Sequence, residues 1–240
     1  MTFGYALLTQ RLVIGLPVLW GLLAGLFVYI GLYYFLRSLV AGLVSITAPI
    51  FRLNFIVTAF LAIVLLREPL TLAKLIGFLL ALIAVWLLLG ALDRGYSLTH
   101  KVTQRSLIQV SIATVAFGAS NFFHKMGIQQ GILPETMVVM QAAAFCPLAT
   151  LFAWWAEGQL PPPASTWRHA LPSAIVLFFA TLFLLHSLAR GPASVLVPIA
   201  QMGFIVPAAL GIALLGEQLT LRKAAGLTAA LAALGALAMA

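Results

Sequence analysis

The chain has 240 residues, of which 63% are hydrophobic and only 8% are charged, and its formal net charge is +8. A soluble domain has about a quarter of its residues charged, and a soluble fold this apolar would expose large patches that aggregate. The thirteen Lys and Arg residues are scattered over the loops without an accompanying aromatic cluster. The composition therefore excludes an ordinary soluble domain and argues against nucleic-acid binding. It predicts an all-α, polytopic membrane protein whose basic residues set topology and contact membrane lipid.

Eight apolar runs are long enough to cross a bilayer, since a spanning helix needs roughly 20 apolar residues. The short breaks between them hold most of the charge, together with Gly and Pro, which end helices for backbone reasons. The runs are too long and unpatterned for barrel strands, which alternate over about ten residues. We therefore expect about eight transmembrane helices, at residues 13–36, 39–66, 72–92, 106–125, 135–155, 170–188, 193–215 and 221–240.

The chain contains an internal repeat. Residues 45–77 align without a gap onto residues 194–226, at a constant offset of 149, and about half of the positions are identical. The two copies lie five spans apart, an odd number, so equivalent helices should cross the membrane in opposite directions, as in inverted-repeat transporters. The matched pairs that apolar composition alone does not explain are Pro49 with Pro198, Glu68 with Glu217, Thr71 with Thr220, Lys74 with Lys223, and Gly77 with Gly226.

This count divides the chain into two unequal repeats. We expect residues 1–95 to form a first repeat of three helices and residues 106–240 a second repeat of five. Two helices equivalent to residues 106–155 are then missing before the first repeat. A naturally shortened form and a late start site both explain this difference, and a homodimer is one way in which a shortened chain could complete its fold.

The repeated motif resembles a known family. Glu68-Pro-Leu-Thr-Leu, followed by Lys74 and Gly77, and the copy from Glu217 to Gly226, look like the signature of EamA-type transporters of the drug/metabolite transporter superfamily. Residues 118–125 resemble the helix that opens the family's repeat, and Pro49 and Pro198 lie where the family has its helix proline. The resemblance implies a fold of ten helices in two inverted repeats of five, truncated here, that moves small metabolites or drugs, often outward.

Arg52 is the foremost candidate for contact with a substrate. It lies inside the second apolar run, where a charge costs roughly 2.5–3.5 kcal/mol on insertion scales, so we expect it to face a polar interior or a partner. Its equivalent in the other copy is Gln201, and the two helix faces could line opposite walls of one cavity. Two interpretations of Arg52 stay open: contact with an anion or carboxylate, and snorkelling to the lipid headgroups.

Other candidates are polar or aromatic residues inside the runs. Tyr29 and Tyr33 share a helix face and could stack on an aromatic or cationic substrate. The resemblance places Asn121 and Gln141 in helices that contribute to a central cavity. For Asn54, Asn121 and Gln201 the alternative is an ordinary interhelical hydrogen bond, worth about 0.6 kcal/mol. His124 is expected to be a solvated interfacial residue, His186 a helix-edge residue without a role, and Cys146 a small buried apolar residue.

The repeated Glu-x-Leu-Thr motif is expected to be structural. Thr71 and Thr220 suit the N-cap positions of the helices that follow them. Glu68 and Glu217 precede the same helices, where the helix dipole favours a negative charge. A proton-coupling carboxylate is the alternative, but both acids lie at the ends of their runs and not in the middle of the membrane.

The residues and the resemblance together predict a secondary transporter, an exporter of a small metabolite or drug-like molecule, that works by alternating access at a midplane site between the repeats. The alternatives are a non-transporting fragment or accessory subunit, motivated by the missing helices, and a membrane-embedded enzyme. An enzyme is disfavoured because the five acidic residues lie near span ends and the four histidines lack metal-ligand spacing. We expect no cofactor or metal, and a multi-pass location in the inner or plasma membrane of the cell.

Overall fold

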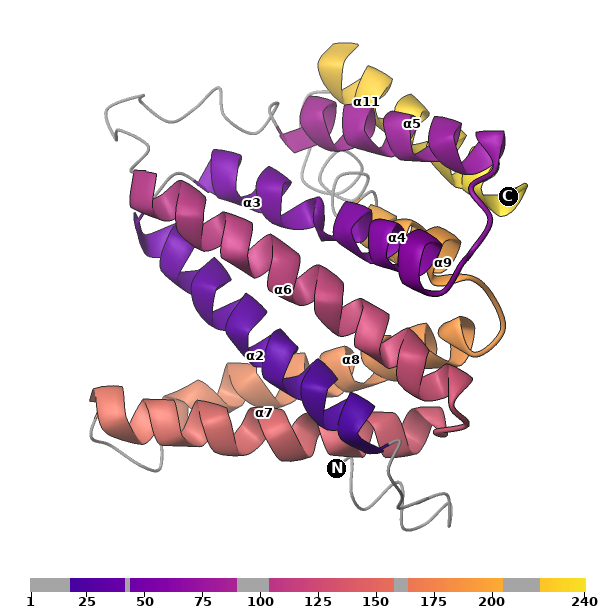
Figure 1. Cartoon of the computed structure of the whole chain (residues 1–240). Coiled ribbons are helices and arrows are strands. Elements are labelled where there is room, and N and C mark those ends of the chain that lie inside the picture. The colour runs from indigo at the N-terminus through magenta and orange to yellow at the C-terminus, as the bar shows by residue number, and fades with distance from the viewer. Residues whose placement is uncertain (1–17, 42–43, 90–103, 158–163, 205–220) are drawn as a thin grey trace. The chain divides into compact units, whose positions relative to one another are not determined.

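The computed structural model describes residues 18–41, 44–89, 104–157, 164–204 and 221–240. These residues form helices and short connections and contain no strand, in agreement with the predicted all-α class. The elements are α2 (Val18–Ala41), α3 (Val44–Arg52), α4 (Asn54–Leu65), α5 (Leu72–Leu89), α6 (Gln104–Gln129), α7 (Pro134–Glu157), α8 (Ala164–Leu188), α9 (Ala193–Gln201), the 3₁₀ turn η2 (Met202–Phe204) and α11 (Leu221–Ala238) (Figure 1).

Several of these helices are suited to a bilayer. Four of the described helical segments are long and apolar enough to span it: Val18–Ala41, Gln104–Gln129, Pro134–Ala156 and Thr166–Leu188. Shorter apolar stretches are Ile50–Leu65, Leu72–Leu87 and Ala224–Ala238. A helix satisfies its own backbone hydrogen bonds, which the hydrocarbon core requires of any spanning segment. The protein is therefore an integral membrane protein built of apolar helices.

The chain divides into two compact units, which do not coincide with the predicted repeats. The first unit combines residues 1–30 with residues 119–191, and the second combines residues 31–118 with residues 192–240. Helices α2 and α6 each contribute residues to both units, α7 and α8 belong to the first, and the remaining described helices belong to the second. Each unit thus draws on both halves of the sequence.

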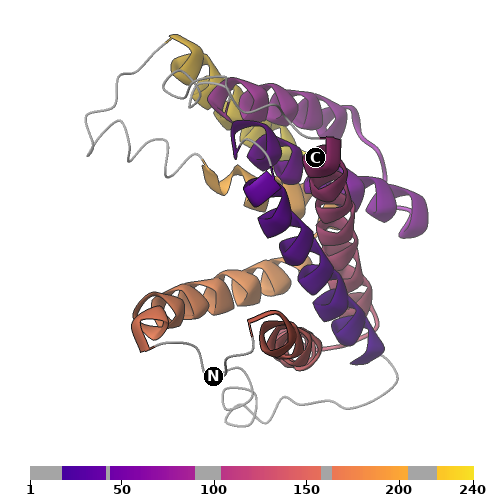
Figure 2. The same ribbon diagram turned by 90° about the vertical axis from the view of Figure 1, so that its left-hand side faces the viewer.

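In the second unit, the two copies of the repeated segment form helices with matching bounds. At the offset of 149 residues that joins the copies, α3 corresponds to α9 and α5 corresponds to α11. Helix α5 packs along α11, as both Figure 1 and Figure 2 show, and α4 packs against α9. Gly77 lies at the contact between α5 and α11, because a Cβ atom there would come within 2.6 Å of Cγ of Leu237. Elements of the two copies therefore pack directly against each other.

The second predicted span, residues 39–66, is not one continuous helix. It is divided into α3 and α4 at Leu53, whose amide donates to the carbonyl of Ile50, three residues back, at 3.0 Å. The equivalent residue, Met202, follows α9 directly and begins η2. Pro49 and Pro198 each precede the break by one turn, and each removes one backbone donor from its helix. The interruption is this single turn residue, and a pattern of apolar residues does not record such a local change of hydrogen bonding.

In the first unit, small residues bring α2 close to α7. A Cβ atom on Gly21 would lie 2.6 Å from Cβ of Met140, and one on Gly25 would collide with the backbone carbonyl of Gln141. Glycines one turn apart are the usual device by which membrane helices approach closely. The hydroxyl of Ser120 on α6 also donates to the carbonyl of Ala24 on α2, at 3.1 Å. Helix α7 in turn packs against α8.

Candidate functional site

Arg52 and Gln201 contact each other in the second unit. They are the last residues of α3 and α9, and Nη1 of Arg52 donates to Oε1 of Gln201 at 3.2 Å. Both side chains are half-buried. The contact joins equivalent positions of the two copies, at the ends of two equivalent helices. The turn residue Leu53 follows α3, and the 3₁₀ turn η2 follows α9.

Polar side chains lie against the turn between α3 and α4. Nδ2 of Asn54 donates to the carbonyl of Phe51 at 2.8 Å. The hydroxyl of Thr114 on α6 lies 3.0 Å from the carbonyl oxygen of Ile50 and 2.7 Å from that of Val110. The hydroxyl of Thr58 on α4 lies 3.0 Å from the carbonyl oxygen of Gly118 on α6. Hydrocarbon offers no hydrogen-bond partners, so polar groups inside a membrane protein pair with one another in this way.

Asn54 also presents an unsatisfied polar atom. Its side chain is fully buried, and within the described part of the chain its Oδ1 atom has no hydrogen-bond partner. A buried acceptor without a donor costs about 1–3 kcal/mol. A donor on a ligand, or a water molecule, would remove this cost. Asn54, two residues after Arg52, is therefore a buried amide whose nitrogen is held by the carbonyl of Phe51 and whose oxygen is left without a donor among the described residues.

An aromatic stack supports the end of α3. The ring of Phe51 stacks on that of Phe35 on α2 at a centroid distance of 4.1 Å, and meets the ring of Phe117 on α6 edge-on at 5.2 Å. Aromatic pairs of this kind add about 0.5–1.5 kcal/mol beyond the burial of their area. Because Phe51 directly precedes Arg52, the stack fixes the backbone from which the guanidinium projects.

The two tyrosines predicted to share a helix face have different partners. The guanidinium of Arg37 lies over the ring of Tyr33 at 5.2 Å, and the ring of Tyr34 meets Tyr33 edge-on at 5.2 Å. Tyr29 belongs to the first unit, where its ring contacts Phe145 of α7 at 6.2 Å. The ring of Tyr33 therefore already contacts a cation of the chain itself, the guanidinium of Arg37.

Asn121 and Gln141 lie in the first unit, where a buried histidine joins them. Nε2 of His124 and Oε1 of Gln141 are 2.7 Å apart, and His124 is 3% exposed. Since the amide oxygen only accepts, Nε2 carries the hydrogen, and Nδ1 of the neutral ring is an acceptor. Within the described residues neither Nδ1 of His124 nor Nδ2 of Asn121 has a partner. The expectation of a solvated His124 was wrong because α6 continues past the predicted helix end to Gln129.

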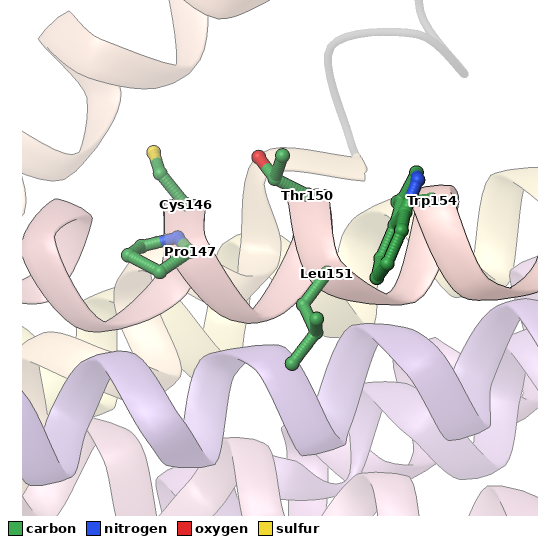
Figure 3. Close-up of a pocket in the computed structure, with 5 residues that line it drawn as sticks. All are labelled: Cys146, Pro147, Thr150, Leu151 and Trp154. Carbon is green, nitrogen blue, oxygen red and sulfur yellow. The ribbon is translucent and has the colours of Figure 1, made fainter. Parts of the chain in front are cut away.

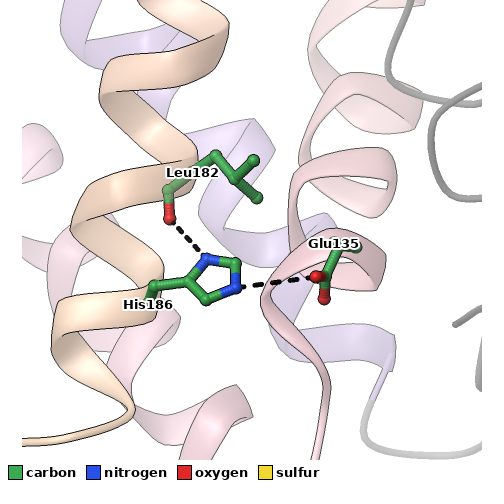
Figure 4. Close-up of polar contacts among 3 residues, drawn as sticks. All are labelled: Glu135, Leu182 and His186. Carbon is green, nitrogen blue, oxygen red and sulfur yellow. Dashed lines mark hydrogen bonds and ion pairs between the residues drawn. The ribbon is translucent and has the colours of Figure 1, made fainter. Parts of the chain in front are cut away.

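The sequence interpretation missed a second polar side-chain pair of the first unit. Nε2 of His186 on α8 lies 3.5 Å from Oε1 of Glu135 on α7, and Nδ1 of His186 lies 2.9 Å from the carbonyl oxygen of Leu182 (Figure 4). Glu135 and His186 come from opposite ends of successive helices, so no local spacing in the sequence pairs them. The only available signal was the position of each residue at a helix end, where its charge is favoured by the dipole.

One face of α7 lines a hollow of about 670 Å³ (Figure 3). Its residues recur at helical spacing and are largely apolar: Cys146, Pro147, Thr150, Leu151 and Trp154. Cys146, expected to be buried, is exposed on this face. A second hollow nearby, of about 360 Å³, includes Tyr29 together with Leu151 and Trp154. This face of α7 presents small and aromatic side chains without an ionisable group beyond the thiol.

The repeated motif makes two contacts that hold helix ends. Oγ1 of Thr71 accepts the amide hydrogen of Lys74 at 3.2 Å, which is the geometry of an N-cap for α5. The carboxylate of Glu68 accepts from the amides of Ala193 and Ser194 at 2.8 and 3.0 Å, and also from the Ser194 hydroxyl. Glu68 therefore serves the first turn of α9, and not that of α5 as expected. Glu217 and Thr220 lie outside the described residues.

The described chain is apolar and helical, and its two equivalent helices α3 and α9 end in contact, at a charged residue and its amide partner. The sequence profile of the EamA-like transporter family matches residues 104–239, which is more than half of the chain. The protein belongs to this family, and is thus a membrane transporter of the drug/metabolite superfamily. The family is one of transporters and not of enzymes.

Solved structures agree on the fold. A crystal structure of another protein matches with a TM-score of 0.80 and 16% sequence identity, over 99% of this chain and 83% of that one. At this identity the likeness shows the fold alone. No curated protein sequence matches this chain. Within the described residues, no three His, Cys, Asp or Glu side chains gather as a metal ion would require.

Proposed function

We propose that the protein is a secondary transporter that exports a small metabolite or drug-like molecule by alternating access. The substrate binds where Arg52 meets Gln201, and the repeats of residues 1–95 and 106–240 rock about this place. The observation that carries the proposal is the hydrogen bond between these two residues, which joins equivalent positions at the ends of α3 and α9. Broken helices at the interface of repeats are the usual substrate site of secondary transporters.

We further propose that the two repeats have inverted topology. The odd number of spans between the copies supports this, as does the direct packing of α5 on α11 and of α4 on α9. A contact between equivalent residues is expected near a pseudo-two-fold axis, because such an axis brings equivalent positions together. The Arg52–Gln201 contact is of this kind.

The chemistry at the break favours a substrate with an anionic group, and a carboxylate fits best. A guanidinium presents five donors in a planar fork that matches the two oxygens of a carboxylate. Gln201 takes one of these donors and holds the fork half-buried, where a charged hydrogen bond is stronger than in water. Oδ1 of Asn54 could accept a donor of the same substrate. We place the transporter in the cell membrane, in contact with its lipid.

Flux in reconstituted vesicles tests this proposal. A panel of small carboxylates, with the matching amides and amines, is first screened by thermal shift, and the best compounds are then measured for flux. Arg52→Gln should weaken the binding of carboxylates on the order of tenfold relative to the binding of their amides, or by about 1.4 kcal/mol. Arg190→Gln, at an exposed arginine of the turn after α8, is the matched control and should change nothing.

Two outcomes would contradict the proposal. Equal preference for carboxylates in wild type and Arg52→Gln would remove Arg52 from the site. Binding without flux in either direction, for every compound that binds, would favour the accessory-subunit function in place of transport.

A further inference from the structure

Each ring nitrogen of His186 faces an oxygen atom. Nδ1 is 2.9 Å from the carbonyl oxygen of Leu182, and Nε2 is 3.5 Å from Oε1 of Glu135 (Figure 4). A backbone carbonyl only accepts hydrogen bonds, so Nδ1 carries a hydrogen. A neutral imidazole has a single N–H, and its Nε2 would then direct a lone pair at the carboxylate. The contact is attractive only when a further proton is present, either on Nε2 or on the carboxyl group.

The positions of both residues favour the form in which His186 holds this proton. Glu135 lies in the first turn of α7 and is 2% exposed, whereas His186 lies in the last turn of α8. A helix dipole stabilises an anion at the N-terminal end and a cation at the C-terminal end, by about 0.3–1 kcal/mol each. The imidazolium of His186 and the carboxylate of Glu135 are therefore each favoured where they lie.

The unit holds further charged and titratable groups. From α6, Nζ of Lys125 donates to the carbonyls of Leu188 and Gly191 at 2.7 Å each, at the same end of α8. His124 of α6 faces Gln141 on α7, and Arg190 is exposed in the turn that follows α8. In the described part of α2 that belongs to this unit, the only titratable side chain is Tyr29, which contacts Phe145.

We propose that Glu135 and His186 form a proton-binding site that links α7 to α8. A proton from water binds Nε2 of His186, whose side chain is 32% exposed, and the imidazolium then attracts the carboxylate of Glu135. When the proton returns to water, the Nε2 lone pair faces the carboxylate and the attraction between the two helix ends is lost. Resting on the proposed transport function, the site makes the proton the ion that biases the transport cycle.

Nitrogen NMR of histidine-labelled protein in lipid vesicles tests the site without any substrate. The resonances of His186 are assigned by their loss in His186→Gln. Between about pH 5 and about pH 8, the range in which histidine titrates, Nδ1 should keep the shift of a protonated nitrogen. Nε2 should move from a protonated to an unprotonated shift, and Glu135→Gln should displace this transition because Nε2 faces the carboxylate of Glu135.

The matched control is His169→Gln on the same helix, 17 residues or about 25 Å away along the axis. It should leave the His186 transition unchanged. An Nε2 that stays unprotonated throughout, or a transition that Glu135→Gln does not move, would overturn the proposal even if the protein transports substrate normally. A displaced transition would establish the site even if no flux were found, so the two proposals fail separately.

The link to transport has its own measurement. In vesicles with an internal pH dye, substrate flux in wild type should move protons, and His186→Gln should abolish this movement while substrate still exchanges. The control variant His169→Gln should transport both substrate and protons. Proton movement that persists in His186→Gln would show that the coupling ion binds elsewhere and would overturn that part of the proposal.

Discussion

The carboxylate of Glu68, in the turn after α4, accepts hydrogen bonds from both the amide, at 3.0 Å, and the hydroxyl of Ser194 in the first turn of α9. The two residues are 126 positions apart in the sequence. The residue just before Glu68 is Arg67, and it turns the chain after α4 with a left-handed backbone, φ of 54°, which is uncommon for a residue with a Cβ atom. Because α9 begins at this contact and ends at Gln201, Glu68 is a positioning residue for the proposed substrate site.

Glu68→Gln should therefore destabilise the protein by about 1–3 kcal/mol, because the buried amides at the start of α9 lose a charged acceptor. The free energy of unfolding is measured in mixed micelles for Glu68→Gln, Ser194→Ala and the double variant. We expect a coupling energy of about 0.5–3 kcal/mol, as for residues in direct contact. Strictly additive effects would show that the contact contributes nothing to stability.

Thr71→Val should lower stability by about 1 kcal/mol, because the amide of Lys74 loses its side-chain acceptor at the start of α5. Thr71→Ser keeps the hydroxyl and is the matched control, with stability close to wild type. Substrate affinity should not change in either variant. Loss of binding at unchanged stability would contradict the capping role.

The sequence predicted where the helices lie better than it predicted the turn that separates α3 from α4. Apolar run length located the helices, since only long apolar segments can cross a bilayer. The repeat offset identified α3 with α9 and α5 with α11, whose bounds match. It did not reveal the turn residue Leu53 between α3 and α4, because a local change of hydrogen bonding leaves no trace in a pattern of apolar residues.

The polar contacts of the structure were predictable only where the repeat related them. Arg52 and Gln201 were paired in the sequence by their equivalent positions, and they contact each other. Glu135 and His186 belong to unrelated positions of α7 and α8, so nothing local in the sequence pairs them. His124 was judged by its distance from a predicted helix end, and that end was placed several residues too early.

Gly25→Ala should destabilise the first unit, because the added Cβ would collide with the carbonyl of Gln141 and lie 2.9 Å from Cβ of Ala144. Overpacking of this kind costs about 1–3 kcal/mol. Gly235→Ala in α11 is the matched control, since nothing lies within 4 Å of its Cβ position. Alanine there should stabilise the helix by about 0.5–1 kcal/mol. Equal effects of the two substitutions on thermal stability would contradict the close approach of α2 to α7.

Arg52→Ala should abolish flux while leaving membrane insertion unchanged, and Arg52→Lys should keep only part of the flux, because an ammonium lacks the planar fork. Insertion is followed by the amount of folded protein in the membrane fraction. Full flux in Arg52→Ala would exclude Arg52 from substrate contact and leave the snorkelling interpretation.

A double exchange tests the equivalence of the two positions most directly. If Arg52 and Gln201 lie near a pseudo-two-fold axis, Arg52→Gln combined with Gln201→Arg places the guanidinium and the amide in each other's positions with the same partner opposite. Arg52→Gln alone should lose most carboxylate flux, and the double variant should regain a substantial part of it. Gln201→Arg alone puts two cations in contact and should reduce stability, since like charges repel most where the dielectric is low. A double variant that inserts normally and is as inactive as Arg52→Gln would show that the two positions are not interchangeable, and that the site is asymmetric about Arg52.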